Sequence, residues 1–190
     1  MKPVVRKEMK QTLRAIPAED ARRKSHAACR LLADQEEFRR ARTAMIYLHI
    51  PHELNVGPLA LAAWQDDKTV LVPKVDYEQR HMIAVEIRSL DTDLEPGRFG
   101  ILEPKAWEPW PVEDIDLVVA PGLAFGREGS RLGRGGGFYD RFLSQPDMHA
   151  VTCGIAFAEQ LLAELPTHAH DVPLDMLVTD DEVLRFNRKR

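Results

Sequence analysis

The sequence has few cysteines, no long apolar run and few aromatic side chains, which make up 7% of its residues. Cys29 and Cys153 lie far apart without the spacing of a metal site, so reduced thiols are expected. No run approaches the roughly eighteen apolar residues of a transmembrane helix. The N-terminal stretch MKPVVRKEMKQTLR alternates apolar and basic residues and does not resemble a secretory signal. These absences predict a cytoplasmic protein.

What is present is typical of a globular protein. The chain has 190 residues, of which 44% are hydrophobic and 29% charged. That length predicts one domain over residues 1–190. Residues 1–42 hold twelve lysines and arginines against six acidic residues, a balance of +6, while the remainder carries −10. A basic N-terminal part on an acidic body indicates either a nucleic-acid arm or a phosphate-binding element.

The basic part is expected to begin with a helix over residues 3–16. Val5, Met9 and Leu13 recur every four residues and form an apolar stripe, and Pro17 disfavours helix at Ile16 and beyond. The basic side chains recur at the same interval, about 100° around the helix axis from this stripe: Lys2, Arg6, Lys10 and Arg14. They either overhang a cleft or form a solvated face, and the pattern alone leaves both open.

Beyond residue 42, apolar strand patterns alternate with helical ones. The expected strands cover residues 43–50, 69–73, 82–88, 116–120, 151–157 and 177–179, and the further helices 17–32, 36–41, 56–64 and 138–143. The wholly apolar run at 117–120 is typical of a covered parallel sheet. The alternation predicts an α/β fold, with a mostly parallel central sheet flanked by helices on both faces.

The segment Asp116–Leu143, DLVVAPGLAFGREGSRLGRGGGFYDRFL, carries the chemistry. A strand leads into a loop with seven glycines, and a helix follows. Such a backbone can turn several amides towards one point, and the helix adds free N–H groups. Arg131 and Arg134 can grip phosphate oxygens, and Asp140 can hold a magnesium ion against them. The alternative is a flexible surface loop. The segment matches neither GxxxxGK[ST] nor a dinucleotide fingerprint, so composition and spacing predict a phosphate site and no more.

The run APGLAFGREGSRLGRGGGFYDRFL closely resembles the signature of the 5-formyltetrahydrofolate cyclo-ligases, also called methenyltetrahydrofolate synthetases. Further resemblances follow in the family's order along the chain: KPVVR and KQTLR, TAMIYLHIPHE, VLVPKV, PGRFGILEP and HAHDVPLDMLVTD. The resemblance implies an enzyme that uses ATP and Mg²⁺ to convert 5-formyltetrahydrofolate to 5,10-methenyltetrahydrofolate, with release of ADP and phosphate.

The resemblance also implies site residues. The nucleotide-binding positions are Lys2, Arg6, Arg131, Leu132, Gly133, Arg134, Gly135, Gly136, Gly137, Phe138 and Tyr139. The folate-binding positions are Leu48, Glu53, Trp107 and the inner loop from Arg134 through Gly135, Gly136 and Gly137 to Phe138. The magnesium positions are Asp140 and Asp171. Gly136 stands where some relatives have lysine, and Phe138 replaces a common tyrosine.

In the implied reaction, ATP phosphorylates the formamide oxygen, the neighbouring folate amine attacks the formyl carbon, and phosphate leaves. Positioning and charge neutralisation then dominate catalysis. Arg134 is the expected transition-state cation, Arg131 the phosphate clamp and Asp140 the metal anchor, while Glu53 accepts hydrogen bonds from the pterin.

Two other classes stay open beside this one. A non-catalytic regulator of the same fold would bind folate or nucleotide without turnover, although retention of Arg131, Arg134, Asp140 and Asp171 argues against it. RNA binding by the basic helix is disfavoured, because aromatic side chains are few and no RNP-like strand motif occurs. The expected partner is therefore a small-molecule substrate, with no nucleic acid and no membrane, and a monomer is expected.

Overall fold

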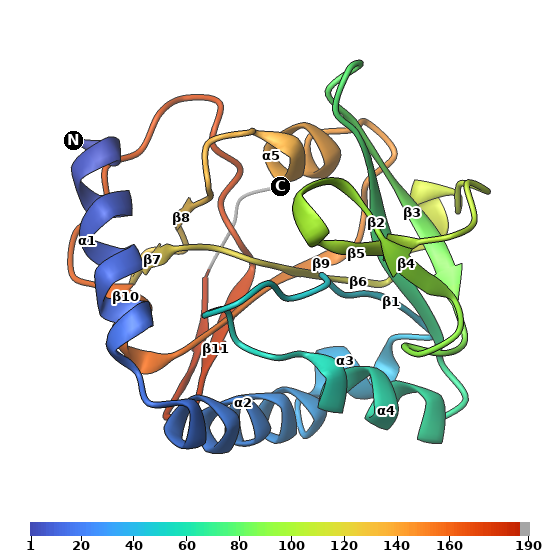
Figure 1. Cartoon of the computed structure of the whole chain (residues 1–190), viewed down its shortest axis with the longest axis horizontal. Helices are drawn as coiled ribbons and strands as arrows, with labels where there is room; N and C mark the ends of the chain where they lie inside the picture. The colour runs from blue at the N-terminus through green and yellow to red at the C-terminus, as the bar shows by residue number, and fades with distance from the viewer. Residues whose placement is uncertain (187–190) are drawn as a thin grey trace.

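The computed structural model describes residues 1–186, so the last four residues of the predicted domain lie outside the described part. Its main sheet has seven strands in the order β12–β11–β9–β6–β1–β2–β3 (Figure 1). Their bounds are β1 Thr43–Met45, β2 Thr69–Asp76, β3 His81–Ile87, β6 Leu117–Ala120, β9 Val151–Ala156, β11 Met176–Thr179 and β12 Val183–Arg185. Smaller sheets are formed by β10 Leu161–Leu162, β7 Ala124–Gly126 and β8 Arg131–Leu132, and by β4 Leu94–Pro96 and β5 Leu102–Pro104.

The central pairings are parallel, which confirms the predicted fold class. Strands β11, β9, β6, β1 and β2 pair in parallel with their neighbours. In this seven-stranded sheet, as far as the described residues show it, the outermost strands β3 and β12 are the ones that pair antiparallel. Parallel strands need crossover connections, and in this sheet helices supply two of them, between β1 and β2 and between β6 and β9. The α-helices of the described residues are α1 Lys2–Ala15, α2 Ala18–Ala33, α3 Glu36–Arg40, α4 Gly57–Gln65 and α5 Phe138–Leu143.

Helices cover both faces of the sheet, as expected. Strand side chains alternate between the faces, so Ala44 and Ile46 face one core cluster while Met45 faces another. The first cluster includes side chains of α1, α2 and α4, and the second includes Phe142 and Leu143 of α5. Figure 1 shows α2 and α4 on one side of the sheet and α5 on the other. Within residues 1–186, no helix has both the length and the apolarity needed to cross a bilayer.

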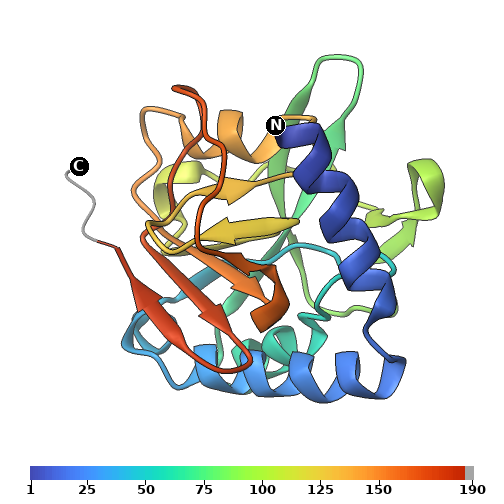
Figure 2. The ribbon, with the colours of Figure 1, turned by 90° about the vertical axis from the view of Figure 1, so that its left-hand side faces the viewer.

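The predicted basic helix at 3–16 is α1, with Met9 and Leu13 buried. It ends before Ile16, whose backbone is extended at φ −70° and ψ 121°, as expected for a residue before proline. Figure 2 shows α1 running along the side of the molecule, and it contacts β7 of the small sheet. Helix α1 is therefore brought next to the glycine-rich segment, although the two are far apart in sequence.

The predicted strand at 43–50 is wrong beyond its first half. Strand β1 ends at Met45, and the last sheet-like bond joins the Ile46 N–H to the Leu71 carbonyl at 2.8 Å. The chain then turns, and the buried Tyr47 hydroxyl donates to the Leu54 carbonyl at 2.7 Å. Ile46 and Tyr47 are apolar because they are buried, not because they remain in the sheet, and burial decreases from Leu48 onwards.

Strand β2 is longer than the predicted 69–73. It continues to Asp76 because β3 pairs with it up to the Asp76–His81 pair. Its partner on the other side, β1, reaches only Leu71, so Pro73 lies where β2 has become an edge on that side. A proline there removes no ladder hydrogen bond.

The glycine-rich segment is more regular than the loop that the sequence predicted. Strands β7 and β8 pair antiparallel inside it, and the Gly126 N–H donates to the Ser130 carbonyl at 2.9 Å. Gly129 closes this hairpin with φ +94°, a conformation that favours glycine. The irregular part therefore shrinks to Gly133–Gly137, between β8 and α5.

Gly154 of β9 gives a test of how tightly this segment is packed on the sheet. A Cβ there would lie 2.7 Å from the Phe125 ring, 2.8 Å from Leu174 and 2.9 Å from Leu177. Since these side chains are buried, Gly154→Ala should lower the free energy of unfolding by about 1–3 kcal/mol, measured by urea denaturation. An unchanged free energy would show that the three side chains move aside at no cost.

Candidate active site

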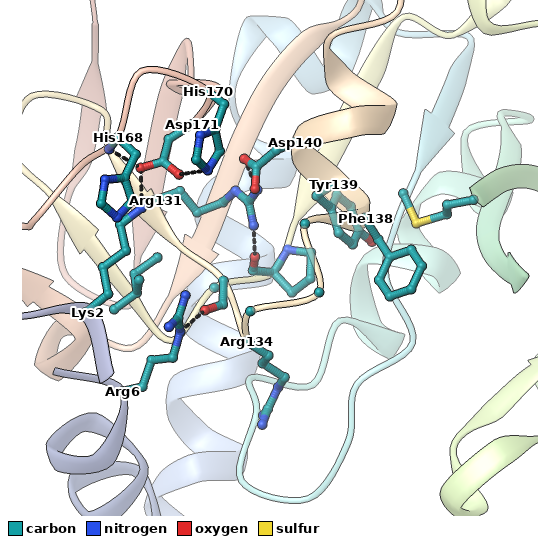
Figure 3. A pocket seen from close by; sticks show the side chains of 18 of the residues that line it. Lys2, Arg6, Arg131, Arg134, Phe138, Tyr139, Asp140, His168, His170 and Asp171 are labelled. Carbon is teal, nitrogen blue, oxygen red and sulfur yellow. Dashed lines mark hydrogen bonds and ion pairs between the residues drawn. The ribbon is translucent and has the colours of Figure 1, made fainter. Parts of the chain in front are cut away.

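A cavity of about 580 Å³ lies at the carboxyl end of β6, between α1, the Gly133–Gly137 loop and the β2–β3 hairpin. Open α/β sheets bind ligands at this kind of crevice, outside the carboxyl ends of their strands. Most of the predicted site residues line it: Lys2, Arg6, Glu53, every residue from Arg131 to Asp140, and Asp171. The fold thus collects residues from both ends of the chain into one place (Figure 3).

Arg131 forms the buried base of this site. Its side chain is only 3% exposed. One terminal nitrogen donates to the Pro121 carbonyl at 3.1 Å and the other to Asp140 Oδ1 at 2.8 Å. Its Nε has no hydrogen-bond partner among the described residues, and neither does the buried Tyr139 hydroxyl, which also belongs to the cavity lining. Burial raises the pKa of Tyr139, so the hydroxyl stays protonated. Both atoms are buried, so they are polar groups that the described residues leave unsatisfied next to the cavity.

Helix α1 closes one side of the glycine run. Arg6 Nε donates to the Gly133 carbonyl at 2.9 Å. A Cβ at Gly135 would lie 3.7 Å from the Arg6 guanidinium. Gly135 and Gly137 have φ values of +110° and +67°, which L side chains rarely adopt. Glycine here therefore serves the turn, because the added Cβ would meet Arg6 only at an ordinary contact distance.

The remaining predicted cations are also paired with carboxylates. Lys2 Nζ lies 2.5 Å from Asp171 Oδ2, and Arg134 Nη2 lies 2.7 Å from Glu53 Oε1. Burial alone would raise the pKa of Asp171, but the hydrogen bonds from Lys2 and the His168 N–H outweigh it and lower that pKa. Asp171 is therefore ionised at neutral pH.

Comparisons with known proteins decide the family. The model of the 5-formyltetrahydrofolate cyclo-ligase family matches residues 1–180. The chain belongs to this family. The resemblance predicted from the glycine-arginine signature is thus confirmed.

Individual family members show the same relationship. The chain is 34% identical over 146 residues to a 5-formyltetrahydrofolate cyclo-ligase from Haemophilus influenzae, covering 75% of this chain and 78% of that protein. It is 27% identical over 191 residues to the mouse protein of that name, covering 93% and 92%. Among solved structures, 5,10-methenyltetrahydrofolate synthetase from Aquifex aeolicus superposes with a TM-score of 0.86 at 32% identity, covering 100% of this chain and 94% of that one.

The two predicted magnesium positions of this cyclo-ligase family member lie in the same cavity but do not form a complete metal site. No cluster of three or more histidine, cysteine or acidic side chains suited to a metal occurs within residues 1–186. Asp140 Oδ1 is engaged by Arg131 and by the Val172 N–H at 3.3 Å. Two carboxylates still fit Mg²⁺, because that ion usually takes one or two protein carboxylates and completes its shell with phosphates and water.

Two predicted folate positions lie outside the cavity lining. Leu48 is half-buried and packs against the main core cluster. Trp107 is 56% exposed, and its ring lies 4.5 Å from Nζ of the buried Lys74. Lys74 in turn donates to the Pro104 carbonyl at 2.7 Å, so it attaches the β4–β5 hairpin to the main sheet. The folate roles of Leu48 and Trp107 remain predictions.

Several lining residues were not predicted. Pro73, Val75 and Met82 come from the β2–β3 hairpin, and His168 and His170 come from the segment before Asp171. The sequence did not predict that this hairpin reaches the cavity. Strand β2 is long because β3 pairs antiparallel with it, and the sequence pattern does not show that pairing. The two histidines form an H-x-H pattern, which alone indicates at most half of a zinc site and not a phosphate or folate site.

The buried Arg131 gives a test of what holds this site together. Arg131→Met leaves the Pro121 carbonyl and Asp140 without their partner, so the free energy of unfolding should fall by about 3 kcal/mol. The control is Arg127→Met, which removes a solvent-exposed pair with Glu182 and should cost less than about 1 kcal/mol. Urea denaturation measures both, and equal losses would show that Arg131 has no special structural role.

Proposed function

We propose that the protein converts 5-formyltetrahydrofolate to 5,10-methenyltetrahydrofolate in a reaction that consumes ATP, requires Mg²⁺, and releases ADP and phosphate. One observation carries this proposal. In this member of the cyclo-ligase family, a single cavity is lined by the glycine run, by the basic side chains of Lys2, Arg6 and Arg134, and by the carboxylates of Asp140 and Asp171. The non-catalytic alternative has no observation in its favour. A cytoplasmic, monomeric protein with a small-molecule substrate is part of the proposal.

The nucleotide's phosphates are proposed to bind over Gly133–Gly137. Backbone N–H groups of this run are free to face a ligand, because the residues lie between β8 and α5 rather than in a sheet ladder. Lys2, Arg6 and Arg134 supply positive charge from two sides. When bound, ATP supplies the phosphoryl group that turns the formyl oxygen into a leaving group. Arg134 is the proposed transition-state cation, since its side chain is 41% exposed and is not fixed by packing.

Arg131 is proposed to assist mainly through its position. Two of its three guanidinium nitrogens already bond to Pro121 and Asp140, which leaves Nε as the nitrogen without a partner among the described residues. Each terminal nitrogen uses only one of its two N–H groups in these bonds, so a phosphate clamp built on this residue would use the donors that remain and the local positive charge. Its larger contribution is to fix Asp140 and the ends of the loop.

The folate is proposed to lie against Glu53 and the apolar wall of the cavity. A pterin ring presents N–H donors along one edge, and a carboxylate is a suitable acceptor for them. Val75, Met82 and Phe138 offer flat or flexible apolar surface for the ring. Leu48 and Trp107 are proposed to add contacts to the folate from outside the cavity.

The reaction itself is the first test. Purified protein mixed with ATP, Mg²⁺ and 5-formyltetrahydrofolate should form the methenyl chromophore and ADP in equal amounts, followed by absorbance and by a coupled ADP assay. Omitting either substrate or the metal should stop both products. Sustained ATP hydrolysis without ring closure would contradict the proposed function.

The metal assignment is tested by Asp140→Asn. The amide can still accept the Arg131 hydrogen bond, but it lacks the charge that Mg²⁺ prefers, so the Mg²⁺ concentration for half-maximal activity should rise. We expect about a tenfold rise, equivalent to ~1.4 kcal/mol of binding free energy. The control is Asp147→Asn, an exposed acid outside the cavity lining. Identical Mg²⁺ titrations for the two variants would place the ion elsewhere.

A further inference from the structure

Arg134 and Glu53 are proposed to serve different substrates, yet they are bonded to each other. Both Arg134 Nε, at 2.8 Å, and Nη2, at 2.7 Å, reach the same carboxylate oxygen, Glu53 Oε1. The pair spans 81 positions of sequence and joins the glycine run to the loop after β1. As long as it is formed, the guanidinium is engaged at Glu53 and so is the carboxylate oxygen.

The two partners differ in freedom of movement. Glu53 is 11% exposed, its Oε2 accepts the Ile50 N–H at 3.2 Å, and its own N–H donates to the Ile50 carbonyl at 3.0 Å. Arg134 is 41% exposed and stands between two glycines, of which Gly135 has φ +110°. In Figure 3 its side chain points away from Asp140 and Asp171. Arg134 is therefore the partner that can move.

We propose that Glu53 determines the acceptor of the phosphoryl group, by holding Arg134 until folate binds and so disfavouring transfer to water. This inference rests on the proposed function. Folate N–H groups compete with Arg134 for Oε1, and nucleotide phosphates compete with Glu53 for the guanidinium. Each ligand must break the same ion pair.

The Arg134–Glu53 ion pair couples the binding of folate to the binding of nucleotide, because both ligands must break it. The first ligand breaks the pair, and the second then binds without that cost, so each raises the affinity for the other by the same factor. The factor is bounded by the strength of one partly exposed pair, which corresponds to about three- to fivefold. Without folate, nucleotide binding alone must break the pair, so a smaller share of the protein holds Arg134 at a phosphoryl group that could pass to water.

The experiment measures the dissociation constant of a non-hydrolysable ATP analogue with Mg²⁺ by calorimetry. Adding 5-formyltetrahydrofolate to the unchanged protein should tighten binding about three- to fivefold. Without folate, Glu53→Gln should produce the same tightening, because Arg134 is released. In an Arg134→Ala background, Glu53→Gln should have no effect.

Three further measurements separate the effect of this ion pair from a general change in charge. Glu159→Gln, which breaks the pair between Glu159 and Lys24 outside the cavity lining, controls for loss of a carboxylate and should change nothing. Glu53→Asp keeps the charge but shortens the reach, so it should also tighten analogue binding. Folate-independent ATP hydrolysis should rise in Glu53→Gln by at least the same factor. Circular dichroism confirms that each variant is folded.

The outcomes separate this inference from the proposed function. If Glu53→Gln tightens analogue binding equally with and without Arg134, the effect comes only from removing the negative charge of Glu53, and the inference is wrong. If the unchanged protein forms methenyl-folate but folate leaves analogue binding unaltered, the inference fails while the proposed function stands. If Glu53 and Arg134 are coupled in the variants but no methenyl-folate forms, the proposed function fails and the ion pair still controls Arg134.

Discussion

The geometry of the cavity depends on one buried arginine. The loop Gly133–Gly137 has no ladder of hydrogen bonds to define its shape, and its glycines give it many accessible conformations. Arg131 lies at the β8 end of this loop and bonds to Asp140 in the first turn of α5, at the other end. Its second bond, to the Pro121 carbonyl, attaches both ends to the exit of β6 in the central sheet. The loop is thus closed between fixed points, which reduces the conformations that a ligand must select.

Sequence patterns predicted the parallel sheet because its strands are buried on both faces and read as short apolar runs between helices. The same logic failed where burial and sheet pairing separate. Ile46–Ile50 is as apolar as a strand, but the Tyr47 hydroxyl bonds to the Leu54 carbonyl and the chain has already left the sheet. Conversely, the short strands β7 and β8 lie among glycines and were not predicted. They pair with each other, and β7 also pairs with β10, through tertiary contacts rather than through their own propensity.

For the site, residue types were predictable and partners were not. Glycines and arginines between a strand and a helix indicate phosphate chemistry from local sequence alone, and the whole run from Arg131 to Asp140 lines the cavity. The ion pairs join residues as distant as Lys2 and Asp171, 169 positions apart, and no local pattern contains that information. The exposed Trp107 illustrates the converse, since an aromatic residue in a proline-rich loop has no periodicity that tells where its ring will lie.

The pairing of charges bears on how the proposed substrates enter. Each of three cavity cations is already matched by a carboxylate: Lys2 by Asp171, Arg131 by Asp140 and Arg134 by Glu53. A ligand that brings only negative charge must break such a pair and leave a carboxylate uncompensated in a partly buried site, which is costly. A nucleotide with its magnesium ion brings both signs. Its phosphates can take over Lys2 while the metal takes over Asp171, so that these two charges each exchange one partner for another, and the Arg131–Asp140 bond that fixes the loop can remain. The arrangement therefore favours entry of the metal and the nucleotide together over either alone, and the folate completes the exchange at Glu53.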